Sequence, residues 1–370
     1  MRILYDGRIY SMQMAGGINR YFANIISRLP PNFAPSLLVE QSREVNYPSH
    51  ANLRIHKFGT LRFNHISHRL SAYSSQLEDY YLRNFTARKR FDVAHPTYYT
   101  LLTRSRVGDY RCPVVITVWD MIHELFPAQM DPTGLHAEEK RRAIMSAQAV
   151  ICISENTKKD LLERYSVPES KVTVTYLASE IDGNISHGVE PVPSRPYFLF
   201  VGSRAVYKNF DALLVSLSET VSMRPEASLC VVGTPFNDSE QKLIAELRLT
   251  NHIEYYGLVG DRHLAKLYRQ SIALVYPTLY EGFGIPPLEA MACGTVVVAS
   301  NCSSIPEVVG DAGLLFDPGS KDELTDVLLS LVNNPAQREQ LIVKGNQRVQ
   351  EFNWNMTAAR TLDVYQSVCN

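Results

Sequence analysis

Short runs rich in β-branched and aromatic residues alternate with longer amphipathic segments along almost the whole chain. This alternation is typical of parallel sheets covered by helices. In the first half it predicts strands at Arg2–Tyr5, Ser36–Val39, Leu53–Lys57, Asp92–His95, Val114–Val118, Ala149–Ser154 and Val172–Thr175. It predicts helices there at Ile18–Leu29, Ile66–Arg88, Ala137–Gln148 and Glu155–Tyr165. From Tyr197 the alternation starts again, with strands at Tyr197–Val201, Ser228–Val232, His252–Tyr255, Ile272–Tyr276 and Thr295–Ala299.

The stretch 178–196 separates these two halves. It is rich in Gly, Pro and Ser and has no apolar periodicity, so it is interpreted as a linker. Two doubly wound α/β domains with a cleft between them are therefore expected. In such sheets ligands bind at the carboxyl ends of the strands, so the loops that follow the strands are the candidate functional segments.

The length and composition of the chain indicate how many domains it can form and which partners and location are expected. A chain of 370 residues, 45% hydrophobic and 20% charged, is long enough for two or three globular domains. Its 37 Lys and Arg residues balance 38 Asp and Glu residues, so no overall charge favours a nucleic-acid partner. The six cysteines lack Cys-x-x-Cys spacing, and the N-terminus lacks the apolar core of a signal peptide. A reducing, cytoplasmic location is expected.

The segment Pro277–Gly294 carries the most informative chemistry. It places Glu281 and Glu289 eight residues apart around a glycine-rich turn, between a predicted strand and a helix with prolines at its start. A helix N-terminus after a glycine turn presents free N–H groups and a positive dipole end, which suits an anion such as a diphosphate. Glutamates placed there are within reach of the hydroxyls of a sugar.

In this segment the chain resembles the retaining family 4 glycosyltransferases, enzymes of GT-B fold, through a Glu-x7-Glu pair with Gly-Phe-Gly after the first Glu. The resemblance extends to Gly16–Tyr21, Val201–Arg204 with Lys208–Asn209, Tyr256–Val259, Ser300–Glu307 and Gly313–Pro318. It implies two Rossmann-like domains that face each other across a cleft. The first, residues 1–185, would bind the acceptor, and the second, residues 196–352, would bind the nucleotide sugar. Residues 353–370 would form a helix, about Asn355 to Val368, that returns to the first domain.

The resemblance also implies roles for individual residues. Glu281 would hold hydroxyls of the transferred sugar and Glu289 would bind the ribose, while Arg204 and Lys208 would neutralise the leaving diphosphate. Asn209 is expected to cap the helix Phe210–Val221. The alternative is that Arg204 and Lys208 are two solvated surface cations. The full set of expected donor-binding residues is Gly17, Gly202, Ser203, Gly233, Leu258, Tyr280, Gly282, Phe283, Gly284, Ile285, Leu288 and Glu289.

In the first half, Asp120 is the candidate catalytic residue. The family usually has a histidine or tyrosine immediately before this aspartate, beside the transferred sugar, but here the position is Trp119. Possible sugar or acceptor contacts are Gly16, Arg20, Trp119 and His123, although a histidine after a strand is more often structural. An indole in place of the polar contact suggests a donor sugar that lacks a hydroxyl at C6.

The resulting hypothesis is a retaining transfer of a hexose or 6-deoxyhexose, of mannose or rhamnose type, from a nucleotide diphosphate sugar. A GDP-sugar is favoured over a UDP-sugar. The acceptor would be a glycan or lipid-linked oligosaccharide used in cell-surface polysaccharide or lipopolysaccharide synthesis. No cofactor or metal site is expected, because Asp-x-Asp is absent and His65 and His68 lack partner ligands. Two alternatives stay open: a nucleotide-sugar 2-epimerase of the same fold, and an inactive nucleotide-sugar-binding partner.

The segment Arg62–Arg90 interleaves aromatic and basic residues. One interpretation is a helix that lies on anionic lipid at the inner membrane surface, where each basic side chain contributes about 1 kcal/mol. The other is a domain helix whose aromatic residues are core. The sequence leaves both open.

Overall fold

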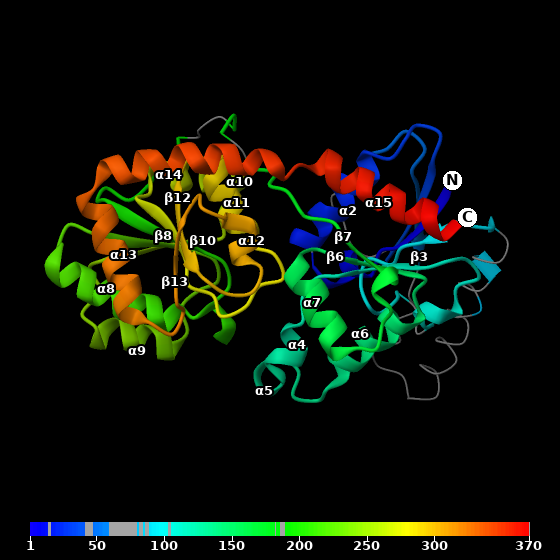
Figure 1. Cartoon of the computed structure of the whole chain (residues 1–370), viewed down its shortest axis with the longest axis horizontal. Coiled ribbons are helices and arrows are strands. Elements are labelled where there is room, and N and C mark those ends of the chain that lie inside the picture. Colours follow the sequence, from blue (N-terminus) through cyan, green and yellow to red (C-terminus); the bar gives the residue numbers. More distant parts are fainter. Residues whose placement is uncertain are drawn as a thin grey trace. The chain divides into compact units, whose positions relative to one another are not determined.

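The computed structural model describes residues 1–13, 16–40, 47–58, 80, 84–85, 89–102, 105–181, 183–185 and 189–369. The chain forms two compact units, one of residues 1–177 with 354–370 and one of residues 178–353, called unit 1 and unit 2 below. Each unit is built on parallel strands with helices packed around them (Figure 1). No helix in the described ranges is long and apolar enough to cross a bilayer.

The described residues of unit 1 form seven parallel strands. They are β1 (Arg2–Asp6), β2 (Ala34–Glu40), β3 (Arg54–Phe58), β4 (Val93–Ala94), β5 (Val115–Val118), β6 (Ala149–Cys152) and β7 (Val172–Val174). Two sheets, in the orders β3-β2-β1-β4 and β5-β6-β7, are joined by an isolated parallel bridge between Ala94 and Val114. The helices are α1 (Arg8–Met12), α2 (Gly17–Ser27), α4 (Ile122–Leu125), α5 (Pro127–Met130), α6 (Leu135–Ser146), α7 (Glu155–Arg164) and α15 (Trp354–Cys369).

The C-terminal helix α15 is part of unit 1, and buried polar contacts hold it there. The hydroxyl of Tyr365 lies 2.6 Å from Nδ1 of His95 and 3.3 Å from the hydroxyl of Tyr5. Nε2 of His95 lies 2.9 Å from Oγ1 of Thr117. Burial lowers the pKa of His95 to about 3, so the imidazole is neutral, with one nitrogen donating and the other accepting. This network joins the end of the chain to its first strand.

Unit 2 contains one parallel sheet with the order β10-β9-β8-β11-β12-β13. Its strands are β8 (Tyr197–Val201), β9 (Ser228–Val232), β10 (Ile253–Gly257), β11 (Ala273–Tyr276), β12 (Val296–Ser300) and β13 (Leu314–Phe316). Its helices are α8 (Phe210–Met223), α9 (Asp238–Glu246), α10 (Asp261–Gln270), α11 (Ile285–Ala292), α12 (Ile305–Val309), α13 (Lys321–Asn333) and α14 (Pro335–Arg348). The strand order reverses between β8 and β11, where ligands bind in doubly wound sheets.

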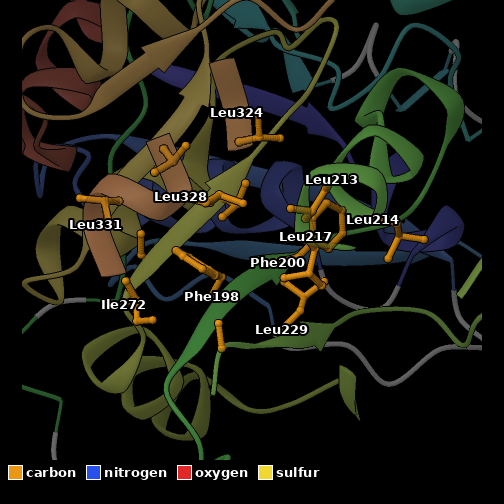
Figure 2. Packing of buried hydrophobic residues seen from close by; sticks show 14 of the residues in the cluster. Phe198, Phe200, Leu213, Leu214, Leu217, Leu229, Ile272, Leu324, Leu328 and Leu331 are labelled. Carbon is orange, nitrogen blue, oxygen red and sulfur yellow. The ribbon is translucent and has the colours of Figure 1, made fainter. Parts of the chain in front are cut away.

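Alternating side chains of β8 build the core of unit 2. Phe198 and Phe200 point toward the leucines of α8 and α13 (Figure 2). The side chain of Tyr197 points to the opposite face of the sheet, where its hydroxyl donates to the carbonyl oxygen of Leu267 on α10 at 2.8 Å. This strand is therefore covered by helices on both sides, which explains its continuous apolar sequence YFLFV.

The predicted strands and helices that lie in the described ranges agree with the structure to within two residues at each end. Tyr197–Val201 and Ser228–Val232 have the predicted bounds. Strand β13 and the short helices α1, α4 and α5 were not predicted, because elements of three to five residues carry too little periodicity. Most of the predicted helix Ile66–Arg88 and of the segment 62–90 lies outside the described residues.

Candidate active site

The loops that follow β8 and β11 meet at the switch point of unit 2. The backbone N–H of Leu279 donates to the carbonyl oxygen of Tyr207 at 2.7 Å, and the hydroxyl oxygen of Thr278 lies 3.0 Å from the same carbonyl oxygen. Tyr207 belongs to the short 3₁₀ helix η3 (Val206–Lys208). These bonds bring Lys208 and Glu281 to one place, although the two residues lie 73 positions apart in the sequence.

Lys208 and Glu281 form a close ion pair. Nζ of Lys208 lies 2.6 Å from Oε1 of Glu281 and 3.1 Å from the hydroxyl of Tyr276. The hydroxyl of Thr278 donates to the same carboxylate oxygen at 2.9 Å. The side chains of Lys208 and Glu281 are 13% and 11% exposed, so the pair is largely removed from water yet reachable. Burial, with the charge of Glu281 as a further cause, raises the pKa of Tyr276 and keeps its hydroxyl protonated.

Arg204 is not a solvated cation. Its Nε lies 2.8 Å from Oε1 of Glu240, and the two side chains are 3% and 7% exposed. Its Nη2 donates to the carbonyl oxygens of Thr234 and Pro235, in the loop after β9. The guanidinium also lies 4.8 Å from the ring centroid of Phe236, while its buried Nη1 has no hydrogen-bond partner. Arg204 therefore ties the loop after β8 to the loop after β9.

The loops after β8 and β9 also contact each other closely through one glycine in each loop. Gly202 and Gly233 have φ angles of +139° and +147°, which side-chain-bearing residues rarely adopt. A Cβ atom on Gly233 would lie 2.0 Å from the carbonyl oxygen of Gly202. Only glycine therefore permits this contact between the turns that follow β8 and β9.

Asn209 does not cap helix α8, contrary to the prediction. It adopts a left-handed conformation with φ 53°, and its side chain accepts no hydrogen bond from the helix. Its Nδ2 instead donates to the carbonyl oxygen of Pro318 at 3.2 Å. The left-handed backbone points the side chain away from the first turn, and asparagine tolerates this conformation better than most residues.

The Pro277–Gly294 segment forms the turn and helix that were expected after strand β11. Helix α11 begins at Ile285, has prolines in its first turn, and is followed by Gly294 with φ 72°. Tyr280, Phe283 and Leu288 are 6%, 3% and 0% exposed, so little of their side chains is open to a ligand. The backbone of Gly282 and Gly284 is also buried, while Ile285 is partly exposed.

Three further predicted donor-binding residues of unit 2 differ in their exposure to solvent. Glu289 is 6% exposed, and the hydroxyl of Tyr268 donates to its Oε2 at 2.9 Å. Ser203, next to Gly202, is exposed. Leu258, directly after β10, is 87% exposed. An exposed leucine beside a glycine turn offers an apolar surface on which a flat base could rest.

In unit 1, Asp120 lies after β5, and the ammonium of a buried lysine contacts both its backbone and its side chain. Nζ of Lys140 lies 2.9 Å from the carbonyl oxygen of Asp120, 3.7 Å from its Oδ1 and 2.8 Å from Oε2 of Glu124. The hydroxyl of Tyr165 donates to Oε1 of Glu124 at 2.7 Å. Asp120 Oδ1 accepts from the backbone N–H of Ile122 at 3.0 Å, and its side chain remains 26% exposed.

Trp119 differs from its predicted role as a sugar contact. Its side chain is 7% exposed and lies edge-on to the rings of Tyr21 and Phe22, with centroid distances of 5.0 Å and 6.1 Å. The indole therefore belongs to the core of unit 1, so Trp119 gives no reason to expect a 6-deoxy sugar.

The other residues of unit 1 that were predicted to contact the sugar or acceptor lie in α4 and at the start of α2. His123 packs 5.1 Å from the ring of His136, and burial lowers its pKa. Gly16 and Gly17 stand at the start of α2 in the expected place, and the backbone N–H of Arg20 donates to the carbonyl oxygen of Gly16. Among the described residues, no three His, Cys, Asp or Glu side chains gather as a metal site would require.

Sequence reasoning missed several residues that shape these sites. They are Lys140, Glu240, Tyr276, Thr278, Ser303 and Ser304. Tyr276 and Thr278 flank Pro277 beside the motif, so their position was a usable signal. Ser303 and Ser304 lie within Ser300–Glu307, one of the segments that carry the resemblance. Lys140 and Glu240 carried no such signal, because their partners Asp120 and Arg204 lie 20 and 36 positions away.

Each unit matches a family model of glycosyltransferases. A model described as Glycosyltransferase Family 4 matches residues 15–179, and one described as Glycosyl transferases group 1 matches residues 185–348. O-antigen chain mannosyltransferase B of Escherichia coli is 30% identical over 233 residues, covering 60% of this chain and 61% of that protein. The MMP alpha-(1->4)-mannosyltransferase of Mycolicibacterium hassiacum is 30% identical over 233 residues, covering 62% and 56%. The chain thus spans about three-fifths of the length of the curated relatives it matches.

The fold of nearly the whole chain is similar to that of solved structures. Sucrose-phosphate synthase from Thermosynechococcus elongatus aligns with a TM-score of 0.78 at 18% identity, over 99% of this chain and 98% of that one. That protein and this one share two Rossmann-like domains. The chain therefore belongs to the glycosyltransferases of GT-B fold, with a family 4 glycosyltransferase domain followed by a group 1 glycosyl transferase domain.

Proposed function

We propose that this protein is a retaining glycosyltransferase that moves a hexose from a nucleotide diphosphate sugar to a glycan or lipid-linked acceptor in cell-surface polysaccharide synthesis. The observation that carries the proposal is the pairing of Lys208 and Glu281 at 2.6 Å, at the switch point of the unit 2 sheet. Glu281 precedes helix α11 by only a few residues. A cation, a carboxylate and a helix N-terminus thus lie close together.

Each of these groups suits one part of a sugar diphosphate. The ammonium of Lys208 and the positive end of α11 would stabilise the negative charge that grows on the leaving diphosphate. Pro286 and Pro287 have no N–H, so in this turn the backbone donors come from the residues beside them. The carboxylate of Glu281 would accept hydrogen bonds from sugar hydroxyls, and these bonds are stronger because the acceptor is charged. Glu289, one turn into the helix, would bind the ribose.

The donor is proposed to be GDP-mannose. Two relatives are mannosyltransferases by name, one of them acting on the O-antigen chain. The buried position of Trp119 removes the reason for preferring a 6-deoxy sugar, so an ordinary hexose is favoured. Metal independence is proposed on the positive charge of Lys208, which supplies the stabilisation that a divalent cation would otherwise provide.

Retention is proposed to proceed at the front face of the sugar, with a leaving phosphate oxygen accepting the proton of the acceptor hydroxyl. In support, the carboxylate of Glu281 is already paired with Lys208 and hydrogen-bonded to Thr278, which lowers its nucleophilicity. Unit 1 would bind the acceptor, with Asp120 contacting it. A place at the cytoplasmic membrane face would follow from a lipid-linked acceptor.

The test is a panel of GDP-mannose, GDP-fucose, UDP-glucose and dTDP-rhamnose, measured first by thermal stabilisation and then by transfer to lipid-linked oligosaccharides. We expect GDP-mannose to stabilise the protein most and the product to carry an α-linkage by NMR. Conversion of the donor in the absence of any acceptor would indicate a 2-epimerase instead. Stabilisation by nucleotide sugars without any turnover would indicate an inactive binding partner.

A further inference from the structure

The loop that carries Glu281 is hydrogen-bonded by three consecutive residues, Cys302, Ser303 and Ser304. They lie between β12 and α12 and are called the 302–304 clamp below. The thiol of Cys302 lies 3.2 Å and 3.3 Å from the carbonyl oxygens of Thr278 and Leu279. The hydroxyl of Ser304 donates to the carbonyl oxygens of Glu281 and Phe283 at 3.0 Å and 2.7 Å. The clamp thus contacts the loop on both sides of Glu281.

Ser303 contacts the backbone amide of Glu281 itself. The backbone N–H of Glu281 donates to its Oγ at 3.0 Å. Because Ser304 holds the carbonyl group of the same residue, both peptide planes next to the Cα of Glu281 are fixed. The direction in which the Glu281 side chain leaves the backbone is therefore set by the clamp, while Lys208 and Thr278 hold its carboxylate.

Ser303 makes this contact in an unfavourable conformation. Its φ is 50°, one of four positive values among the described non-glycine residues. A side-chain-bearing residue in the left-handed region is disfavoured relative to glycine, and strained residues gather where the surrounding structure has a functional demand. Glycine would adopt this backbone more readily but has no hydroxyl to accept the Glu281 N–H.

We propose that Ser303 is a positioning residue for Glu281, retained for its hydroxyl at the expense of backbone strain. The inference rests on the proposed glycosyl transfer. The hydroxyl restricts Glu281 to the orientation in which its carboxylate meets the transferring sugar. A loop that served only to fill space would accept glycine here with no loss of rate.

The test uses two variants that separate strain from hydrogen bonding. Ser303→Gly relieves the strain and removes the acceptor, whereas Ser303→Ala keeps the strain and removes the acceptor. The control is Ser300→Ala on the same segment, because Ser300 is fully buried and its Oγ has no hydrogen-bond partner. Three quantities are measured for each: the melting temperature, hydrogen exchange at the Glu281 amide by mass spectrometry, and steady-state transfer from GDP-mannose.

For Ser303→Gly we expect a melting temperature within about 2 °C of the wild type, because relief of strain offsets the added chain entropy. The Glu281 amide should exchange faster, and kcat should fall about tenfold with KM for the donor nearly unchanged. Ser303→Ala should show the same kinetic loss together with a lower melting temperature. Ser300→Ala should match the wild type in all three measurements.

Three results would overturn the proposal, and the first two are unchanged amide exchange in Ser303→Gly and faster exchange with wild-type kcat. A rate loss that only follows the melting temperature across the variants would also contradict it, since that is a structural role. Absence of transfer by the wild-type protein would instead refute the proposed function. In that case unchanged amide exchange would still overturn the positioning claim, since that measurement needs no turnover.

Discussion

The ammonium of Lys208 and the carboxylate of Glu281 lie 2.6 Å apart and are both largely shielded from water. A desolvated pair of this kind behaves as a unit, because removal of one partner leaves the other charge uncompensated in a poorly solvated place. The pair is also nearly neutral as a whole. If the diphosphate of a bound donor pairs with the ammonium of Lys208, the carboxylate of Glu281 becomes available to accept hydrogen bonds from sugar hydroxyls. Diphosphate binding by Lys208 and sugar binding by Glu281 are therefore linked.

The two glutamates should respond differently to amide substitution. Glu281→Gln keeps the shape but removes the charge, so kcat should fall by about 10²–10³, or roughly 2.7–4 kcal/mol of transition-state stabilisation. Glu289→Gln should weaken nucleotide and donor binding alike, which appears mainly in KM. Steady-state kinetics and calorimetric titration with GDP measure both effects. Equal losses of nucleotide affinity in the two variants would show that the role of Glu281 is misassigned.

Arg204 should contribute to folding as well as to the site. Arg204→Lys replaces a planar group that bonds Glu240 and two carbonyl oxygens by a single ammonium, so the free energy of unfolding should fall by about 3 kcal/mol. Lys242→Ala on helix α9 is the control, because its pair with Glu246 is 78% and 58% exposed and should contribute less than about 0.5 kcal/mol. Urea unfolding of both variants decides this. Similar small losses would mean that the buried pair adds nothing.

The contact between Gly202 and Gly233 should not tolerate a side chain. Gly233→Ala would place a methyl group 2.0 Å from a backbone oxygen at φ +147°, so a loss of at least about 2 kcal/mol is expected. Gly108→Ala is the control, since Gly108 is exposed and its new Cβ would meet only ordinary contacts of 3.4 Å and more. Thermal unfolding compares them. A wild-type melting temperature for Gly233→Ala would show that the turns can separate freely.

Asp6 should make unit 1 less stable as the pH rises. Burial raises the pKa of its carboxyl from 3.8 to about 7, and hydrogen bonds from Leu102 and Tyr110 only partly oppose this. The folded state then binds more protons than the unfolded state between about pH 4 and 7, so stability is present below pH 4 and is lost as the pH rises through 7. Asp6→Asn should remove this loss. Parallel stability curves for both proteins from pH 5 to 8 would contradict the assignment.

Transfer should survive chelation of divalent metals. Lys208 and the N-terminus of α11 already supply positive charge where the diphosphate would leave, so no cation is required there. The rate of transfer from GDP-mannose with and without EDTA tests this. Complete loss of activity, restored by magnesium or manganese, would refute it.

The sequence by itself determined the class of fold and the position of most elements. Strands such as Tyr197–Val201 are covered by helices on both sides, so they must be apolar throughout, and that local signal needs no knowledge of the rest of the chain. It also located the Pro277–Gly294 segment, because a helix start and a glycine turn depend on nearby residues. Elements as short as β13 carried too few residues for the same treatment.

Only the tertiary structure decided which charges meet. Arg204 and Lys208 stand four positions apart and looked equivalent in the sequence, yet one pairs with Glu240, 36 positions away, and the other with Glu281, 73 positions away. The same holds for Trp119, whose burial follows from Tyr21 and Phe22 on a distant helix. Local sequence sets backbone conformation, but the desolvation and pairing of a charged side chain depend on what packs over it, and that is set by contacts between segments remote in the chain.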